Sequence, residues 1–465
     1  MQPVGGLYAW SRCEQIGLID RMERLSRVAG HVGSRSETEE ETAKSLNSLA
    51  LDFCGLSHVL TESERELCKA VRSVAESLRM ELEEAVETTV MPPSVVREMQ
   101  KLGSRCGGLQ LKGYGCAGLS TTAALLVIFE LARVDPSLAT LYMVHCGVSM
   151  KAIAVGGSEE QKAKWLPRMA ALQCIGGFAL TEPEAGSDAT SLGSTAVAVD
   201  GGWLLTGRKR WIGNVVGGGL VVVWARVVER EEERGREGGG GRIGGFVVEH
   251  NGKEGEHRGR GGGTWRVKKI LAKGALRAVQ NAEIEFDRFF VPECNRLALC
   301  DSWEEGIRPV LESSRVTAAA LATGAAAGAL ERALGHCLRR RQFRRPLASF
   351  QLVQERLVSS AASVQGLFLS LLHAGRLMDR QNTEKKPGEL FSAAQGSMLK
   401  AHCTKEAREV ARKCRECMGG DGVLLSDSGA MRFLADLEAV HTYEGTYDVN
   451  MLIAGKALTG CSAFK

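Results

Sequence analysis

The chain is poor in aromatic residues, in proline and in net charge. Aromatic residues make up 5% of 465 residues, so the cores must be mainly aliphatic. Proline occurs ten times, and after Val310 only Pro346 and Pro387 interrupt the chain, which leaves room for long helices. No run reaches about 18 consecutive apolar residues, so we expect no membrane span. A net charge of +4 gives no basis for nucleic-acid binding, which needs a clustered basic surface.

Glycine and cysteine, by contrast, are abundant. The 55 glycines exceed the usual share of about 7%, and the 14 cysteines are scattered along the chain. No secretory apolar segment stands at the N-terminus, so we expect free thiols in a reducing compartment. Cys414 and Cys417 form a lone C-x-x-C without a histidine at ligand spacing, and we therefore expect no metal site.

The hydrophobic period divides the chain into three parts. At roughly 100–200 residues per domain, the length predicts two to four domains. Apolar residues recur at about 3.6 residues before position 176 and after position 292, and at about 2 between these positions. The sequence thus predicts a mainly α protein with a central β domain. Its parts are a poorly ordered leader (1–50), an N-terminal helical domain (51–175), a middle β domain (176–292) and a C-terminal helical bundle (293–465).

Helix-capping residues, helix-breaking prolines and local composition predict where individual helices and loops begin and end. Thr61 and the acids after it predict a helix start, and Pro92 ends that helix. Within the β domain, the glycine-rich segment 228–263 is predicted to be a solvated loop between two strands. The principal helices are expected over 60–90, 121–133, 142–155, 315–341, 350–379 and 391–418.

Three single residues stand in motifs that suit ligand binding, and each has a simpler explanation. Trp211 lies among basic and small residues, but such a tryptophan is more often packed in a core. Arg340 could bind a diphosphate with its planar guanidinium, but five arginines between 339 and 345 also suit a solvated face. Glu444 precedes Gly445 in a turn between helices, where a lone carboxylate is usually solvated.

Taken in order and spacing, these motifs resemble the acyl-CoA dehydrogenase/oxidase flavoprotein family. The similarity runs from about residue 51 to residue 465, except for the glycine-rich segment. Within the family it is nearest to plant-type peroxisomal short-chain acyl-CoA oxidases (the acyl-CoA oxidase 4 type) and to glutaryl-CoA dehydrogenases. The segments that carry the resemblance are 111–116 (LKGYGC), 132–135 (ARVD), 210–214 (RWIGN) and 442–448 (TYEGTYD).

The resemblance implies an N-terminal helical bundle, a β-barrel-like middle domain and a C-terminal four-helix bundle, with FAD between the last two. It also implies a homotetramer, a dimer of dimers in which neighbouring subunits share each FAD, with Arg340 and Gln351 supplied by the neighbour. The implied cofactor-binding residues are Phe178, Leu180, Thr181, Gly186, Ser187, Trp211, Ile212, Gly213, Arg340, Gln351, Glu416, Gly419, Gly420, Thr446 and Asp448.

The resemblance further implies that Glu444 is the catalytic base in the dehydrogenation of an acyl-CoA to trans-2-enoyl-CoA, with a short acyl chain expected. A carboxylate with an ordinary pKa of about 4.3 is a weak base, so we expect substrate binding to expel water and raise it. The implied substrate-binding residues are Ser187, Arg315, Gly445 and Phe464.

Two positions depart from relatives. Glutaryl-CoA dehydrogenases carry an arginine where this chain has Ala139, so a glutaryl carboxylate would be unpaired there. Some relatives place the base immediately before Arg315, where this chain has Ser314. A glutaryl-CoA dehydrogenase-like enzyme, a non-catalytic FAD-bound scaffold and a nucleic-acid-binding relative are the alternatives. The intact Glu444 and the small net charge argue against the last two.

The sequence constrains the electron acceptor and the cellular compartment less than it constrains the reaction. Reduced flavin passes electrons either to O2, as in an oxidase, or to electron-transfer flavoprotein, as in a dehydrogenase. Arg24-Leu25, followed after five residues by His31-Val32, resembles an N-terminal peroxisomal signal, although the last position departs from the usual Leu or Ala. We expect a peroxisomal protein, with the mitochondrion as the alternative.

Overall fold

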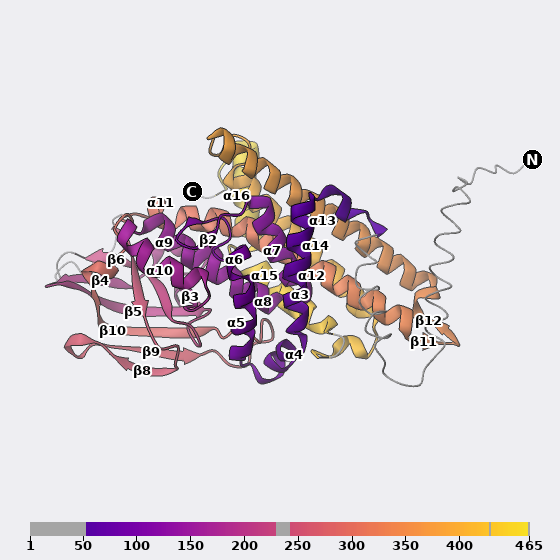
Figure 1. Cartoon of the computed structure of the whole chain (residues 1–465), viewed down its shortest axis with the longest axis horizontal. Helices are drawn as coiled ribbons and strands as arrows, with labels where there is room; N and C mark the ends of the chain where they lie inside the picture. The colour runs from indigo at the N-terminus through magenta and orange to yellow at the C-terminus, as the bar shows by residue number, and fades with distance from the viewer. Residues whose placement is uncertain (1–52, 229–241, 427–428, 464–465) are drawn as a thin grey trace, which may run out of the picture.

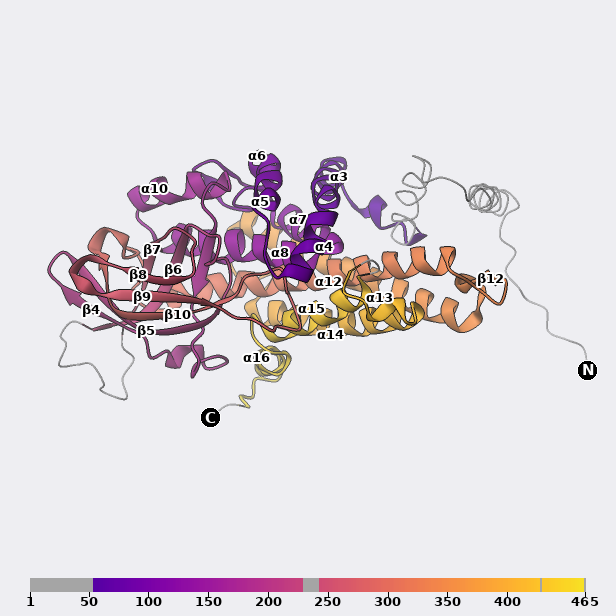
Figure 2. The same cartoon turned by 90° about the horizontal axis from the view of Figure 1, so that it is seen from below.

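The computed structural model describes residues 53–228, 242–426 and 429–463 (Figure 1). The expected leader, the signal-like segment 24–32 and Phe464 lie outside the described residues. The β sheet occupies one end of an elongated molecule, and the long C-terminal helices reach the other end (Figures 1 and 2).

The N-terminal part is helical, and its first long helix begins where the sequence predicts. Thr61 and Glu64 form a capping box at the start of α3. The single helix expected over 60–90 is wrong, because the chain leaves the helical conformation at Leu78, which separates α3 from α4. The helices are η1 (Leu56–Val59), α3 (Glu62–Ser77), α4 (Arg79–Thr88), α5 (Pro93–Met99), η2 (Gln100–Leu102), α6 (Gly103–Cys106), α7 (Thr121–Val134), α8 (Pro136–Tyr142), η3 (Met143–Met150), α9 (Lys151–Gly156) and α10 (Glu159–Ala170).

One of these helices has unusual hydrogen bonding. The expected helix over 142–155 is helical, but its first part, η3, is a π-helix. A π-helix widens the turn and changes the direction of the side chains that follow it, and such segments are frequent at functional sites. It lies against β3 and α12, between the β domain and the C-terminal helices.

The middle domain is a mixed eight-stranded sheet. Its strand order is β3-β6-β4-β5-β10-β9-β8, and β7 pairs with β6. The pairs β3–β6 and β4–β6 are parallel and the others are antiparallel. The strands are β3 (Gly176–Ala179), β4 (Thr195–Val199), β5 (Gly202–Ile212), β6 (Leu220–Val228), β7 (Ile243–Glu249), β8 (Gly255–Arg258), β9 (Thr264–Lys269) and β10 (Ala282–Pro292).

The segment 228–263 contains two strands, so its prediction as a loop is wrong. β7 is almost wholly buried and pairs with β6, and β8 forms the sheet edge beside β9. Gly244 and Gly245 lower the apolar signal of β7, but a Cβ at Gly245 would press against Trp224 and Leu297. The glycines therefore allow close packing here, and composition alone could not distinguish this from a solvated loop.

The C-terminal part is a helical bundle, as expected. Its two longest helices, α12 and α13, are joined by a short hairpin of β11 (Arg341–Gln342) and β12 (Arg345–Pro346). The helices are α11 (Trp303–Gly306), α12 (Arg308–Arg339), α13 (Gln351–Glu384), α14 (Ala393–Cys417), α15 (Ala430–Thr442) and α16 (Tyr447–Thr459).

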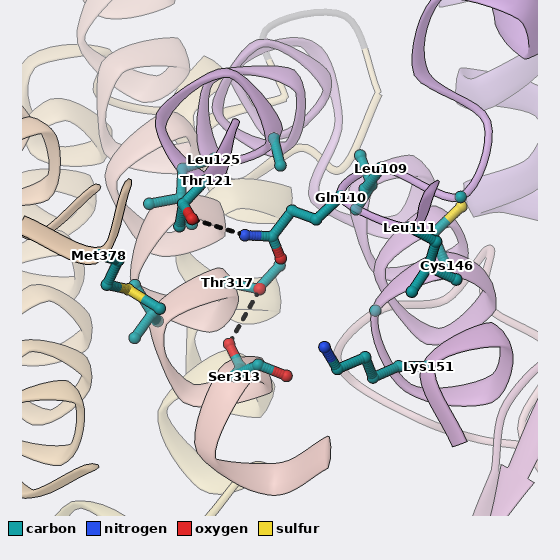
Figure 3. A pocket seen from close by; sticks show the side chains of 14 residues that line it. Leu109, Gln110, Leu111, Thr121, Leu125, Cys146, Lys151, Ser313, Thr317 and Met378 are labelled. Carbon is teal, nitrogen blue, oxygen red and sulfur yellow. Dashed lines mark hydrogen bonds between the residues drawn. The ribbon is translucent and has the colours of Figure 1, made fainter. Parts of the chain in front are cut away.

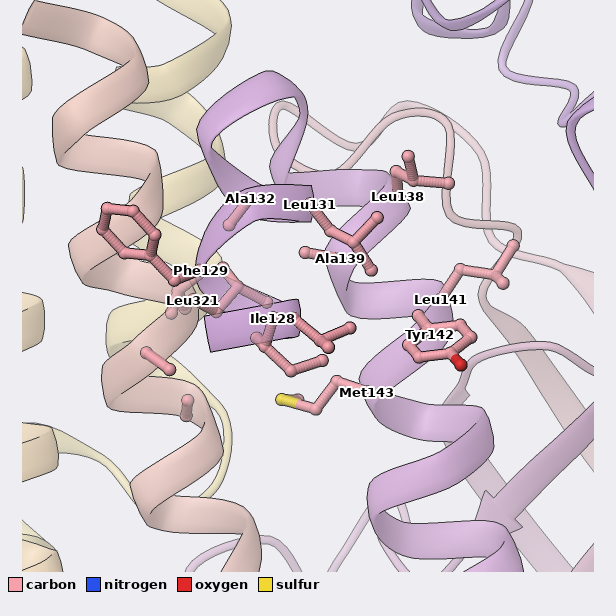
Figure 4. Packing of buried hydrophobic residues seen from close by; sticks show 14 of the residues in the cluster. Ile128, Phe129, Leu131, Ala132, Leu138, Ala139, Leu141, Tyr142, Met143 and Leu321 are labelled. Atoms are coloured by element: carbon pink, nitrogen blue, oxygen red, sulfur yellow. The ribbon is translucent and has the colours of Figure 1, made fainter. Parts of the chain in front are cut away.

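Helix α12 joins the N-terminal helices to the bundle by close packing. It carries a buried run of alanines and glycines and packs against α7, α14, α13 and α15. A Cβ added at Gly324 or Gly328 would overlap the carbonyl oxygen of Phe129 or Arg133 on α7. Around this contact, side chains of α7, α8 and η3 fill the core with Leu321 of α12 (Figure 4).

Within the described ranges, two helical stretches are long and apolar enough to cross a membrane by length and composition alone. They are Pro136–Gly156 and α13, with mean hydropathies of 1.5 and 1.4. The first is 72% buried inside the protein, and α13 packs against α12, α14 and α7. Buried core helices meet the same criteria of length and composition, and both stretches pack as core helices in this fold.

The close contact between α12 and α7 predicts a position-specific effect of alanine. Replacing Gly328 with Ala forces two backbones apart, and we expect it to lower the free energy of unfolding by about 2 kcal/mol. Gly366, on the exposed side of α13, has no described atom within 4 Å of an added Cβ. Gly366→Ala should therefore raise stability by about 0.5 kcal/mol. Chemical denaturation of both variants measures this, and equal effects would contradict the proposed packing role.

Candidate active site

Glu444 lies in the turn between α15 and α16, and the turn needs an unusual backbone. Glu444 and Gly445 have φ angles of 54° and 81°, a region that favours glycine. Asn450, fully buried on α16, donates its amide to the carbonyls of Glu444, Gly445 and Thr446 at 3.3, 2.8 and 3.1 Å. The hydroxyl of Thr446 caps α16. The predicted residues Gly445 and Thr446 thus shape the loop that presents Glu444.

The Glu444 side chain is held between a hydroxyl and two cations, so its interpretation as a solvated surface residue is wrong. Ser314 Oγ on α12 donates a hydrogen bond to its carboxylate. Burial raises the pKa of Glu444, and the Ser314 hydrogen bond and the charges of Lys400 and Arg315 oppose that rise. Ser314, at the position where some relatives place the base, therefore contacts the predicted base Glu444.

Lys400 is a site residue that the sequence reasoning missed. Its ammonium is fully buried on α14 and donates to the carbonyls of His441 and Gly445 at 2.9 and 2.7 Å. Burial lowers the pKa of Lys400 to about 8, against the opposing effect of Glu444. The sequence feature that could have identified Lys400 is its place between two apolar residues, Leu399 and Ala401. Its position also keeps the helical spacing of the buried residues of α14.

Arg315 lies beside the same carboxylate. It is half-buried, and its Nη1 donates to Ser397 Oγ at 3.2 Å. Burial lowers its pKa, and the neighbouring carboxylates Glu444 and Glu312 oppose that shift. Of the four predicted substrate-binding residues, Arg315 and Gly445 are thus brought next to Glu444. Ser187 is exposed on a turn of the β domain, and Phe464 is not described.

The turn that carries Trp211 is anchored close to Glu444. Asn214 donates to the carbonyl of Leu141 at 2.9 Å, and the next residue toward the N-terminus, Thr140, shares a hydrogen bond of 3.4 Å with the Tyr443 hydroxyl. Tyr443 directly precedes Glu444. Helix α8 therefore joins the segment at the end of β5, where the predicted residues Ile212 and Gly213 lie, to the loop of Glu444.

Trp211 is not a core residue. Its side chain is 51% exposed and its φ is 66°, while Ile212 and Gly213 beside it are buried. Asn281 donates to the Trp211 carbonyl at 3.1 Å, and the Arg210 guanidinium lies 5.3 Å from the indole centroid. A fixed backbone thus presents a large aromatic surface, and the prediction that it packs in a core is wrong.

The predicted residues 178–187 form β3 and the turn after it. The backbone N–H of Arg210 donates to the Thr181 carbonyl at 2.9 Å, so this segment lies beside the Trp211 turn. Phe178 is half-buried and Leu180 is buried, whereas Gly186 and Ser187 are exposed. A Cβ at Gly186 would meet no described atom within 4 Å, so its surroundings are open.

A buried ion pair that the sequence reasoning missed shapes this segment. Lys209 Nζ, fully buried on β5, donates to Glu182 at 2.7 Å and to the Leu180 carbonyl at 3.1 Å. Glu182 also accepts hydrogen bonds from the backbone of Gly193 and Ser194. Burial lowers the pKa of Lys209 to about 8, against the pull of Glu182. The pair holds the turn to the sheet.

The remaining predicted cofactor residues lie elsewhere in the chain. Arg340 and Gln351, both exposed, flank the β11–β12 hairpin at the far end of the bundle (Figure 2). At 1.5 Å per residue, Arg340 lies about 37 Å along α12 from Arg315. Glu416, Gly419 and Gly420 are at the end of α14, and Glu416 pairs with Arg356 of α13 at 3.4 Å. Asp448 is exposed in the first turn of α16.

One chain therefore does not bring the two groups of cofactor residues together. Their sharing of one FAD between neighbouring subunits stays a prediction. Each group fits one part of FAD. The exposed indole and open turn around Gly186 suit a flat ring system, and the exposed arginines of 339–345 suit a diphosphate. In a single chain these arginines form a solvated face, so their role in binding stays a prediction.

All 13 cysteines in the described ranges are free thiols, including Cys414 and Cys417, which are buried in α14. Within the described residues, no group of three or more histidine, cysteine, aspartate or glutamate side chains could hold a metal ion.

Known proteins share this architecture. Family models for the N-terminal, middle and C-terminal domains of acyl-CoA dehydrogenase match residues 61–173, 177–289 and 306–459. An acyl-CoA dehydrogenase of Bacillus subtilis (strain 168) is 31% identical over 86% of this chain and 99% of its own. Isovaleryl-CoA dehydrogenase of Solanum tuberosum, a mitochondrial protein, is 27% identical over 74% of this chain and 77% of its own.

Solved structures agree with these matches. A crystal structure of glutaryl-CoA dehydrogenase from Mycobacterium smegmatis has a TM-score of 0.77 and 35% identity, covering 90% of this chain and 99% of that chain. A second structure of a glutaryl-CoA dehydrogenase from that organism, in complex with FADH2, has a TM-score of 0.77 and 32% identity over 88% and 97%. The chain belongs to the acyl-CoA dehydrogenase family, whose members are FAD-dependent oxidoreductases acting on the CH–CH bond of acyl-CoA.

Proposed function

We propose that this protein binds FAD and converts a short-chain acyl-CoA to its trans-2-enoyl-CoA, with Glu444 as the base. The environment of the Glu444 carboxylate carries this proposal. Glu444 is half-buried, its carboxylate accepts a hydrogen bond from Ser314, and the charges of Lys400 and Arg315 act on it. Its surroundings therefore raise its basicity while keeping an ionised form accessible.

Proton removal from the α-carbon also requires stabilisation of the thioester carbonyl, on which negative charge develops. The φ of 54° at Glu444 turns its backbone away from the helical pattern, and no described residue accepts a hydrogen bond from its N–H. This N–H is thus available to donate to the substrate carbonyl. A preorganised donor of this kind contributes about 3 kcal/mol of transition-state stabilisation.

The residues around Trp211 and Gly186 would hold the flavin ring of FAD, and Arg340, Gln351 and 416–420 of a neighbouring subunit would hold its diphosphate and adenosine. When bound, FAD supplies the hydride acceptor for the β-carbon. This arrangement supports a homotetramer built as a dimer of dimers, because a single chain separates the two groups of residues. The exposed apolar side chains Phe343 and Leu352 near the hairpin agree with a covered face in the assembly.

Two electron acceptors are compatible with this chemistry. Family membership and relatives named as dehydrogenases favour electron-transfer flavoprotein, whereas the resemblance to peroxisomal acyl-CoA oxidases favours O2 in a peroxisomal enzyme. The purified protein should be yellow and should bleach with butyryl-CoA under anaerobic conditions. Rapid recolouring in air with formation of hydrogen peroxide identifies an oxidase, and slow recolouring identifies a dehydrogenase. A yellow protein that no acyl-CoA bleaches would be a non-catalytic scaffold.

Replacing Glu444 with Gln should abolish flavin reduction while leaving FAD bound. The amide has nearly the same shape but cannot take the α-proton, and loss of a general base costs about 100- to 10,000-fold. Stopped-flow absorbance of the bound flavin measures the rate. Glu438→Gln, at an exposed position of α15 six residues earlier, is the control and should reduce flavin normally. Normal reduction in the Glu444 variant would refute the assignment.

Replacing Lys400 with Met should shift the pH profile of flavin reduction. Loss of the cation disfavours ionised Glu444, so the pKa of Glu444 rises and the acidic limb moves to higher pH. The rate should recover as pH increases, which a merely distorted loop would not allow. Lys405→Met, exposed on the same helix, should keep the original profile. A uniformly lowered rate with an unmoved limb would indicate a structural role alone.

Replacing Arg340 with Gln should weaken FAD retention without altering the fold of the subunit. Losing one charged donor to a diphosphate costs about 2 kcal/mol, or about 30-fold in affinity. The ratio of flavin to protein after gel filtration is the measurement. Arg380→Gln, on the exposed side of α13 where Arg380 pairs with Glu384, is the matched control. Equal flavin content in both variants would remove Arg340 from the cofactor site.

A further inference from the structure

The pocket between the N-terminal helices and α12 does not include the candidate base. Gln110 and Lys151 line its polar side (Figure 3), and Glu444 is not among the described residues that line it. A set of hydrogen bonds elsewhere in the structure reaches both the turn that presents Trp211 and the helix that leads to Glu444.

These hydrogen bonds are made by the loop between β9 and β10 (270–281), called here the β9–β10 loop. The backbone N–H of Leu276 donates to the carboxylate of Asp436, a buried residue of α15, at 2.5 Å. At the end of the loop, Asn281 Nδ2 donates to the Trp211 carbonyl at 3.1 Å. The loop thus contacts the helix that leads to the candidate base and the turn that presents the exposed indole.

Lys273 holds the β9–β10 loop in its shape. Its Nζ donates to the carbonyls of Leu276 and Val279 at 2.8 and 2.6 Å, and to Asn281 Oδ1 at 2.6 Å. Burial lowers the pKa of Lys273 to about 8, and the charge of Asp436 opposes that shift. Three oxygen acceptors therefore replace the water that this ammonium lost on folding, and one of them is the side chain of Asn281.

This contact orients the Asn281 amide toward the Trp211 turn. Because its Oδ1 accepts from Lys273, its Nδ2 faces the Trp211 carbonyl. A Cβ added at Gly213 would lie 3.7 Å from the same Nδ2, so the amide lies against the turn. The φ of 66° at Trp211 is one that a bulky residue adopts only where its surroundings hold it. The Asn281 amide supplies such a hold.

We propose that Lys273 and Asn281 are positioning residues for the flavin, because they hold the Trp211 turn in a fixed place relative to the helix of Glu444. This rests on the proposed function, which places the flavin ring at Trp211 and the base at Glu444. Asp436 anchors the β9–β10 loop on α15. A change in the loop should therefore alter how the flavin and the acyl-CoA approach each other, and leave acyl-CoA binding unchanged.

The substitution Asn281→Asp removes the second contact of this set while keeping the first. The carboxylate still accepts from Lys273, but it cannot donate to the Trp211 carbonyl. Amide hydrogen exchange of a peptide that contains 211–214, followed by mass spectrometry on the purified protein, reports how firmly the turn is held. We expect exchange there to become about fivefold faster, as the loss of one hydrogen bond predicts. The control Asn382→Asp, at an exposed position of α13, should leave it unchanged.

Two measurements on the FAD-loaded protein separate positioning from stability. A misplaced ring should lower the maximal rate of flavin reduction by butyryl-CoA about tenfold, with an unchanged half-saturating concentration of butyryl-CoA. Emission of the bound flavin should rise, because an indole packed against the ring quenches it. Lys273→Met should have the same effects as Asn281→Asp, and Lys268→Met, exposed on β9, should have none.

Unaltered exchange at 211–214 in both variants would overturn the proposal. Faster exchange with normal flavin emission and a normal maximal rate would also overturn it, because the turn would then be held without effect on the flavin. A lower melting temperature with a normal maximal rate per bound flavin would show a role in folding alone. If the unaltered protein binds FAD but no acyl-CoA reduces it, the proposed function fails, and exchange and flavin emission still decide on Lys273 and Asn281.

Discussion

The close approach of α12 to α7 is the contact on which the rest of the structure depends. Small side chains along α12 let its backbone come within van der Waals distance of the carbonyls of Phe129 and Arg133. The same helix then contacts η3, α8, α13, α14 and α15. Its first turns carry Ser313, Ser314 and Arg315, so the packing of its middle determines where the residues around the base lie.

Buried charge is the second organising feature, and it is concentrated where the chain must hold precise shapes. Lys400 binds the loop of Glu444, Lys209 with Glu182 binds the turn after β3, and Arg133 with Glu331 links α7 to α12. Each ion lost water on folding, and each is compensated by a carboxylate or by carbonyl oxygens. Lys151 differs from these three because the described residues around it supply no such partner.

The sequence by itself determined the types and order of most elements. Helical periods, the Thr61 cap and the scarcity of proline indicated the two helical parts, because these signals depend on near neighbours in the chain. The segment 442–448 pointed to Glu444 as the base only through its resemblance to a family, and that role stays a prediction. Sequence reasoning failed at β7, where glycines that permit packing resembled a loop, and at Leu78, where the helix breaks although the buried residues keep a helical spacing across the break. Only the tertiary structure decided that Ser314 and Lys400 contact the loop of Glu444, that Trp211 is exposed, and that Lys151 faces a pocket. These residues lie far apart in the chain, and the energies that place them arise from burial and desolvation, which exist only after the helices have packed.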